Sequence, residues 1–394
     1  MAKFELTDLG MFTRLWSDSD MKYLQTFIDN SALLRTNYNF VYQNFKVNPN
    51  IVPQGADGDM SFTVRQKINE PDGMADIKNA LGKNIAIDQK GSQVYSGTLT
   101  NFGRALNPIT VLDLEQKEKV MAQFGSDSPL VMDYIENIQI LKNYADSRLS
   151  NMAGQIMSTG KIKAYNDSTN GIIMYPLDAQ VPSANKVTAG TKVWSASDCN
   201  ILDQMSKIET NYRNRTGDLQ PMKWQIPLYM WRNVFLTNSK LKEDIIAWRK
   251  LNDMTTTDGK TVMEDWVTTF INNIGITSPI EVITEGEVEV GQAPNARKDV
   301  QGWANTVAVL RPVGFAGDIL HGEILKAKLS SKYSNSVVQK MVAYMNGGIY
   351  ALINSIKYDD DGYPVLHTDM EGCAVPVLTE TPAHVIVDTA TADS

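Results

Sequence analysis

The chain has 394 residues, of which 43% are hydrophobic and 21% charged, and its formal net charge is −8. This is the composition of a globular protein of one elaborate domain or two to three ordinary ones, and it excludes a largely disordered chain. No uninterrupted apolar run is long enough to cross a bilayer, so the sequence predicts no transmembrane helix.

The opening stretch "MAKFELTDLGMFTRLW" has a charge every few residues and no apolar core, so we expect no secretory signal there. The two cysteines, Cys199 and Cys373, lie far apart in the sequence. They favour a reducing compartment without a disulfide framework.

Negative charge is concentrated at the end of the chain. Residues 358–394 hold eight Asp and Glu residues and no Lys or Arg, and the remaining acids equal the 37 bases in number. No basic stripe occurs in sequence order, as an electrostatic DNA-binding protein would require. The simplest interpretation of the acidic end is a solvated surface.

Residues 1–50 begin with a predicted short helix and continue as an extended segment. The helix follows a capping signature in "SDSDMKYLQTFI", residues 17–28, where apolar side chains recur at helical spacing. The aromatic and Asn-rich stretch 37–53, "NYNFVYQNFKVNPNIVP", has no clear period. We expect it to be an arm that needs another surface to pack on.

The next segment predicts a long two-stranded excursion. Residues 60–69 alternate apolar and polar side chains, as in a strand with one solvated face, and a return strand fits 92–104. An isolated hairpin is only marginally stable in water, so we expect this one to rest on a neighbour.

Residues 129–159 predict one long helix. Ser128 and Pro129 give an N-cap and a favoured first residue, and Gly160 is placed to end the helix. Apolar residues recur at spacings of three and four in a continuous stripe, at positions 130, 134, 138, 141, 145, 149, 152 and 156. The helix would be roughly 45 Å long. Since no second helix of this length is predicted, we interpret it as a strut and not as a coiled coil.

The elements expected after the strut alternate between strands and helices. They are a hairpin at 161–177, a helix within 194–217 capped by Asp198 and closed by Gly217, a strand that turns helical at 223–236, strands at 279–291 and 300–315, and one or two strands at 374–390.

A search for catalytic chemistry finds no specific motif. None of the three histidines, His321, His367 and His384, has a second His or Cys at metal-ligand spacing. The Gly259–Thr261 run lacks the first glycine of a phosphate-binding loop, and the acidic run 359–361 lacks the first and last ligands of a calcium loop. We therefore predict no catalytic, cofactor-binding or metal-binding residues and no cofactor. A carboxylate-dependent hydrolase remains a minor alternative, because two acids can always meet in a cleft.

Four features each need another surface to pack on: the strut, the hairpin, the arm and the acidic end. This favours a subunit that interlocks with copies of itself. Four stretches, in this order, resemble the major capsid proteins of tailed double-stranded DNA bacteriophages, the lambda-type family with the HK97 capsid fold. They are "AGQIMSTGKIKAYNDSTNGIIMYPL", "WSASDCNILDQMSKI", "QPMKWQIPLYMWRNVFLTNSKLKEDI" and "VAVLRPVGFAGDILHGEI". The resemblance covers about residues 50–390. "MYPL" departs from the Phe-Gly-Arg-like pair that usually ends the family's return strand.

The resemblance implies an α+β, HK97-like fold with a long spine helix, an extended β-hairpin loop, and axial and peripheral domains. The implied divisions are 1–50, N-terminal arm; 51–112, extended loop; 113–193, spine helix and peripheral domain; 194–322, axial domain; and 323–394, return to the peripheral domain with the acidic end. Residues 323–372 have no assigned role.

The implied function is that of a structural major capsid subunit, not an enzyme, which self-assembles into an icosahedral virion shell around the phage DNA. Its partners would be copies of itself in pentamers and hexamers, with scaffold, portal and decoration proteins and no membrane. It would enclose DNA without sequence-specific binding and assemble in the bacterial host cytoplasm. Alternatives are another virion component or a nanocompartment shell of the same fold.

Overall fold

The computed structural model describes residues 39–54, 60–66, 94–110, 128–163, 165–167, 172–252, 264–275, 277–284, 302–328, 337–358 and 364–392. The helix expected at 17–28, the tip of the hairpin, the Gly259–Thr261 run and the acidic run 359–361 lie outside these residues, wholly or in large part.

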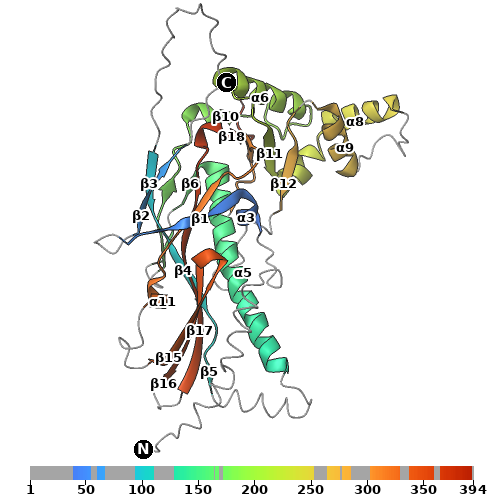
Figure 1. The fold of residues 1–394 in the computed structure, drawn as a ribbon. Helices are drawn as coiled ribbons and strands as arrows, with labels where there is room; N and C mark the ends of the chain where they lie inside the picture. Colours follow the sequence, from blue (N-terminus) through green and yellow to red (C-terminus); the bar gives the residue numbers. More distant parts are fainter. Residues whose placement is uncertain are drawn as a thin grey trace, which may run out of the picture.

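A single long helix runs beside a sheet that extends along the molecule (Figure 1). This helix, α5, spans Ser128–Thr159 and contains 32 residues, so the predicted strut is confirmed. The predicted stripe is buried wherever its side chains are described, at Ile138, Leu141, Ala145, Leu149, Met152 and Ile156. Gly160 ends the helix with a φ of 72°, the left-handed conformation that favours glycine.

The sheet against α5 has seven strands, with β17 (Pro364–Leu378) at its centre. The first part of β17 pairs with β16 on one side and with β4 and β5 on the other, and its last part pairs with β14. The other members are β1 (Phe45–Val52), β4 (Asn101–Ala105), β5 (Ile109–Thr110), β14 (Gly317–Gly322), β15 (Val337–Met345) and β16 (Tyr350–Tyr358). Residues 323–372, which had no assigned role, thus supply much of this sheet.

The second sheet has five strands in the order β10-β18-β13-β11-β12. Its strands are β10 (Lys186–Thr188), β11 (Met222–Pro227), β12 (Ile280–Ile283), β13 (Val307–Pro312) and β18 (Val385–Asp388). Successive side chains of a strand point to opposite faces, and both faces are buried here. Val309 and Ile386 belong to the core shared with α5, whereas Leu310 and Val387 belong to a second core. The five-stranded sheet therefore separates two hydrophobic cores.

Three helices and a short helical segment enclose the second core. They are α6 (Ile201–Thr216), α8 (Ser239–Leu251), α9 (Glu264–Ile274), and α7 (Leu228–Met230) with the π-helical Trp231–Phe235. The predicted strand that turns helical is β11 with α7. The cap of α6 was wrongly predicted. Asn200 accepts the hydrogen bond from the amide of Asp203, whereas Asp198 lies before the helix and pairs with Lys192.

Short strands fill the region after α5. The predicted hairpin at 161–177 is confirmed as two antiparallel pairs, β6 (Lys161–Ile162) with β9 (Leu177–Asp178) and β7 (Tyr165–Asp167) with β8 (Ile172–Met174). The remaining short helices are α3 (Phe40–Asn44), α11 (Leu325–Lys328) and the 3-10 turns Ser183–Asn185, Asn346–Gly348 and Thr381–Ala383.

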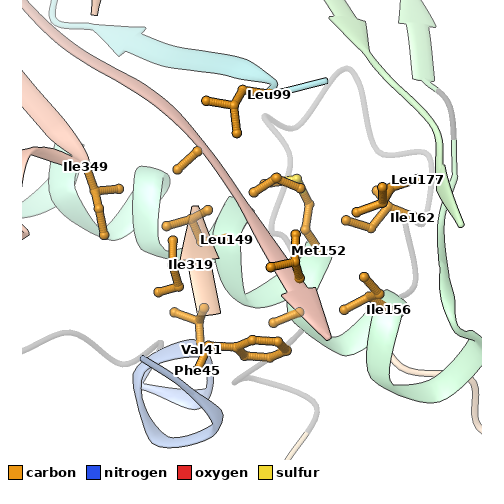
Figure 2. Packing of buried hydrophobic residues seen from close by; sticks show 14 of the residues in the cluster. Val41, Phe45, Leu99, Leu149, Met152, Ile156, Ile162, Leu177, Ile319 and Ile349 are labelled. Carbon is orange, nitrogen blue, oxygen red and sulfur yellow. The ribbon is translucent and has the colours of Figure 1, made fainter. Parts of the chain in front are cut away.

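The arm prediction is wrong for its described part. Phe40, Val41 and Phe45 are each no more than 1% exposed, because α3 packs on α5 and β1 pairs with β14 of the same chain. Figure 2 shows Val41 and Phe45 facing Ile319 beside the α5 side chains. The stretch had no clear period because a short helix passes directly into a strand.

The α+β class is confirmed by the two sheets and the helices. The division into arm, loop, peripheral and axial domains stays a proposal. Within that proposal, β17 packs against α5, whereas β18 pairs with β13 and so joins the five-stranded sheet.

Candidate assembly framework

The hairpin is fixed to the body of its own chain at its base. Strands β2 (Ser61–Arg65) and β3 (Val94–Thr98) pair antiparallel, which confirms the predicted pairing. Phe62, Val64 and Tyr95 are buried on one face. The Tyr95 hydroxyl donates to the Leu378 carbonyl at 2.8 Å, a bond across to β17. The expectation that the hairpin rests on a neighbour is therefore wrong for its base.

Close packing holds β3 in position. A Cβ at Gly97 would lie 2.5 Å from Cδ1 of Leu177 and 2.8 Å from Cζ of Phe62. A Cβ at Gly322 would lie 2.3 Å from the Met60 sulfur. No side chain fits at either glycine without displacing its neighbours, so the base of the hairpin sits directly on β9 and β14.

A buried polar cluster, which we call the spine network, joins α5 to the seven-stranded sheet. Its members are Tyr42, Lys142, Asp146, Asn346 and Tyr350. Asp146 accepts hydrogen bonds from the hydroxyls of Tyr42 at 2.7 Å and Tyr350 at 2.8 Å, and from Nζ of Lys142 at 2.6 Å. Asn346 donates to the Tyr42 hydroxyl at 2.7 Å. The network ties α3, α5, β16 and the turn before it to one carboxylate.

The spine network keeps its protons in a fixed pattern. The Asp146 side chain is fully buried and that of Lys142 is 5% exposed. Burial, together with the nearby Asp146 carboxylate, raises the pKa of Tyr42 and Tyr350 well above the usual tyrosine value. Both phenols therefore stay protonated as donors, and the buried charge of Asp146 is compensated by a cation and two hydroxyls.

A second buried cluster, the Arg311 network, joins α3 to the five-stranded sheet. Arg311 is 1% exposed and donates through Nε to Gln225 at 2.9 Å and through Nη2 to the side-chain oxygen of Asn44. Its Nη1 donates to the carbonyls of Pro312 and Gly314 at 2.9 and 2.8 Å. Asn44 ends α3, whereas Gln225 and Arg311 lie on β11 and β13. The network therefore fixes α3, which leads directly into β1, against the five-stranded sheet.

Burial lowers the pKa of Arg311 to about 10, against the opposing effect of the nearby Glu281 and Glu380 carboxylates. Arg311 thus remains a cation at neutral pH. Glu281 accepts from Gln225 at 3.0 Å and from Lys223 at 2.6 Å, which extends the network to β12.

Sequence reasoning did not predict either network. The available signal was Arg311 itself, a charged residue inside the otherwise apolar strand 307–312. Such a residue requires buried acceptors. Its partner Asn44 is 267 residues away, so the sequence alone could not identify it.

The three histidines lie apart and serve the packing of the chain. Nε2 of His384 lies 2.6 Å from the Met157 carbonyl on α5, and Nε2 of His321 lies 3.0 Å from the Asn48 carbonyl. His367 lies on β17 opposite Ser355. In the part of the chain that the structure describes, no cluster of three or more His, Cys, Asp or Glu side chains could hold a metal.

The cysteines are both free and buried, and burial raises the pKa of the Cys373 thiol to about 11. Cys373 is therefore an inert core thiol and not a nucleophile. Among the described residues, no helix is long and apolar enough to span a membrane.

Comparisons with known proteins complete the description. No protein-family model matches the chain, and no curated protein matches it in sequence. Among solved structures, a prophage protein of Escherichia coli CFT073 assigned to the capsid is 14% identical with a TM-score of 0.48, covering 94% of this chain and 98% of that one. A phage-related protein of Bordetella bronchiseptica RB50 is 13% identical with a TM-score of 0.45, covering 94% and 97%. The capsid of the myovirus XM1 is 10% identical with a TM-score of 0.40, covering 90% and 92%. The assignment of a function to this chain therefore rests on its own elements.

Proposed function

We propose that the chain is the major capsid subunit of a tailed bacteriophage, a structural protein without enzymatic activity that assembles into an icosahedral shell around the genome. The observation that carries this proposal is the order of the elements. A 32-residue helix is followed by the hairpins β6–β9 and β7–β8, then α6, then β11 leading into helical turns, and finally β13 and β14. This is the order in which the capsid-like motifs occur in the sequence.

The mechanical properties of the subunit support the same function. A helix of this length extends about 48 Å at 1.5 Å per residue, comparable to the span of a whole small domain. The spine network fixes it to the seven-stranded sheet, and the Arg311 network fixes α3, which leads into β1 of that sheet, to the five-stranded sheet. A subunit braced in this way can act as a rigid wall segment, whose repetition sets the curvature of a shell.

Exposed apolar side chains indicate surfaces that a partner would cover. Val313 and Phe315, in the loop after β13, are 59% and 52% exposed, and Leu219, in the loop before β11, is 84% exposed. A backbone hydrogen bond joins these two loops. Ile140 and Tyr144 are also exposed, on α5. We assign these surfaces to contacts between copies.

The roles of the segments follow as part of the proposal. Residues 113–193 with β14 to β17 would form the peripheral domain, and residues 194–316 with β18 would form the axial domain at the centres of pentamers and hexamers. The arm would comprise the residues before α3. Scaffold, portal and decoration proteins would be the further partners. The shell would hold DNA without sequence-specific contacts, and assembly would take place in the cytoplasm of a bacterial host.

The test is to express the full chain and to examine it by negative-stain electron microscopy and sedimentation velocity. Closed shells, or sheets of five- and six-membered rings, are the expected result. The variant Leu149→Asp places a charge in the core at a fully buried position and serves as a control that should form no ordered assemblies. Fibres alone, or a stable small oligomer with or without added scaffold protein, would contradict the proposal. Nucleic acid within the shells would separate a virus shell from a protein-filled nanocompartment.

A further inference from the structure

A hollow of about 560 Å³, which we call the groove, lies between strand β10 and helix α6. One wall is formed by Ala184 and the stretch from Lys186 to Thr191, and the other is a face of α6 from Gln204 to Arg215. Strand β10 forms one edge of the five-stranded sheet and pairs with β18 on its inner side. Among the described residues, no strand pairs with its outer side. Such an edge can accept a further extended segment.

The rim of the hollow is basic. Lys186, Lys207 and Arg215 line it, and no Asp or Glu does. Arg215 donates hydrogen bonds to the Ala184 carbonyl and the Asn185 side chain, which are neutral, so its charge is not compensated by these contacts. Lys207 and Lys186 are both exposed to solvent. Lys207 also pairs with Asp203, outside the lining, at 2.7 Å.

Apart from the basic residues, the lining of the hollow is partly apolar and partly polar. Val187, Ile208 and Val385 contribute aliphatic surface. Gln204 is 6% exposed, and its side-chain oxygen is buried without a hydrogen-bond partner. A buried acceptor of this kind would gain free energy from a donor in an occupant. The hollow therefore suits an extended segment that is acidic on one side and apolar on the other.

The sequence of this chain contains such a segment directly after β12. In 285–290, "EGEVEV", Glu285, Glu287 and Glu289 alternate with Gly286 and two valines. In an extended chain the three carboxylates fall on one side and the valines on the other. The acidic run 359–361 lacks this pattern, since three consecutive aspartates point to both sides.

Topology brings the segment to the groove of a neighbour. β12 is the edge of the five-stranded sheet opposite to β10. Copies arranged head to tail would place the β12 edge of one beside the β10 edge of the next, and a heterologous contact of this kind closes into a ring when the rotation allows it. We propose that the groove between β10 and α6 binds the acidic segment 285–290 of the next copy in a ring. This inference deepens the proposed capsid function and rests on it.

The binding test uses the peptide "TEGEVEVG", residues 284–291, labelled for fluorescence anisotropy, with the full chain at low salt. The variant Lys186→Glu/Lys207→Glu should bind it about tenfold more weakly, because two exposed ion pairs become repulsions. The matched control Lys163→Glu/Lys250→Glu, at exposed lysines outside the groove, should bind as the wild-type chain does. A peptide with glutamine in place of each glutamate should also bind weakly. Equal binding of this peptide, or of "KYDDDG" (357–362), would overturn the proposal.

The assembly test asks whether the contact joins two copies. The groove variant Lys186→Glu/Lys207→Glu and the segment variant Glu285→Lys/Glu287→Lys/Glu289→Lys should each fail to form rings. An equal mixture should form even-membered rings, because each groove then meets a segment of opposite charge on the other variant. The contrary result is that rings form when both sets of changes are placed in one chain and fail to form in the mixture. That result would show that the segment binds the groove of its own chain, and it would overturn the proposal.

The two tests also separate this inference from the proposed function. If the wild-type chain forms shells and the groove variant forms them equally well, the groove inference fails and the capsid function stands. If the peptide binds as expected but the wild-type chain never forms rings, the capsid function fails and the groove remains an acidic-peptide site.

Discussion

The buried ion pair of the spine network gives the sharpest prediction for stability. Asp146→Asn keeps the shape of the side chain but leaves Lys142, whose side chain is 5% exposed, without its counter-charge. Removal of one partner of a buried pair typically costs about 3–5 kcal/mol, because the remaining charge is desolvated and uncompensated. We expect the free energy of unfolding to fall by that amount, as measured by urea denaturation of the purified chain.

The chain contains a matched control for this change. Lys240 and Asp244 form an ion pair with the same spacing and order on α8, at 2.9 Å, but their side chains are 43% and 37% exposed. Asp244→Asn should therefore lower the free energy of unfolding far less than Asp146→Asn does, because water screens an exposed pair. If both substitutions lower the free energy of unfolding by the same amount, burial does not determine how much the Lys142–Asp146 pair contributes to stability. The role of this pair as a brace would then be refuted. Replacement of both Lys142 and Asp146 by apolar residues should cost less than Asp146→Asn alone.

Three further changes test other parts of the framework. Gly160→Ala should destabilise the chain by about 1–2 kcal/mol, because the residue is left-handed and its Cβ would lie 2.9 Å from Val181; thermal unfolding would report this. Tyr95→Phe should cost about 1 kcal/mol through loss of its hydrogen bond to β17, and hydrogen exchange should rise in β2 and β3 while α6 is unaffected. Burial lowers the pKa of His384, which contacts the Met157 carbonyl, from 6.5 to about 4. Between these pH values the unfolded chain binds a proton that the folded chain does not, so stability should fall by about 3 kcal/mol as the pH drops from 7 to 4. His384→Gln should abolish that part of the pH dependence.

Elements with strong local periodicity could be predicted from the sequence. The apolar stripe between 130 and 156 predicts α5 because a long helix with one buried face repeats its pattern many times. The alternation at 60–65 predicted β2, and glycines in the left-handed region marked the ends of α5 and α6. In each case the signal lies within the element itself.

Elements whose packing depends on distant residues could not be predicted. The stretch 37–53 predicts an arm because nothing near it in sequence offers a core, yet α5 and β14 provide one for its described part. Tyr42 is 104 residues from Asp146, and Tyr350 is 204 residues from it. No local pattern signals that these three side chains meet. The groove beside β10 could not be predicted from the sequence either, because its two walls are separate elements with ordinary compositions.

If the chain assembles as we propose, the distribution of its polar contacts would make the subunit rigid and the contacts between copies reversible. The spine network and the Arg311 network within the subunit are buried, with Asp146 and Arg311 each bonded to several partners, so disrupting them is costly. The proposed contact between copies uses exposed lysines, whose ion pairs are individually weak and screened by salt. A wrongly placed subunit can then dissociate without losing its own fold. On this reasoning, raising the ionic strength should slow ring formation at concentrations where the unfolding temperature of the single chain has not changed.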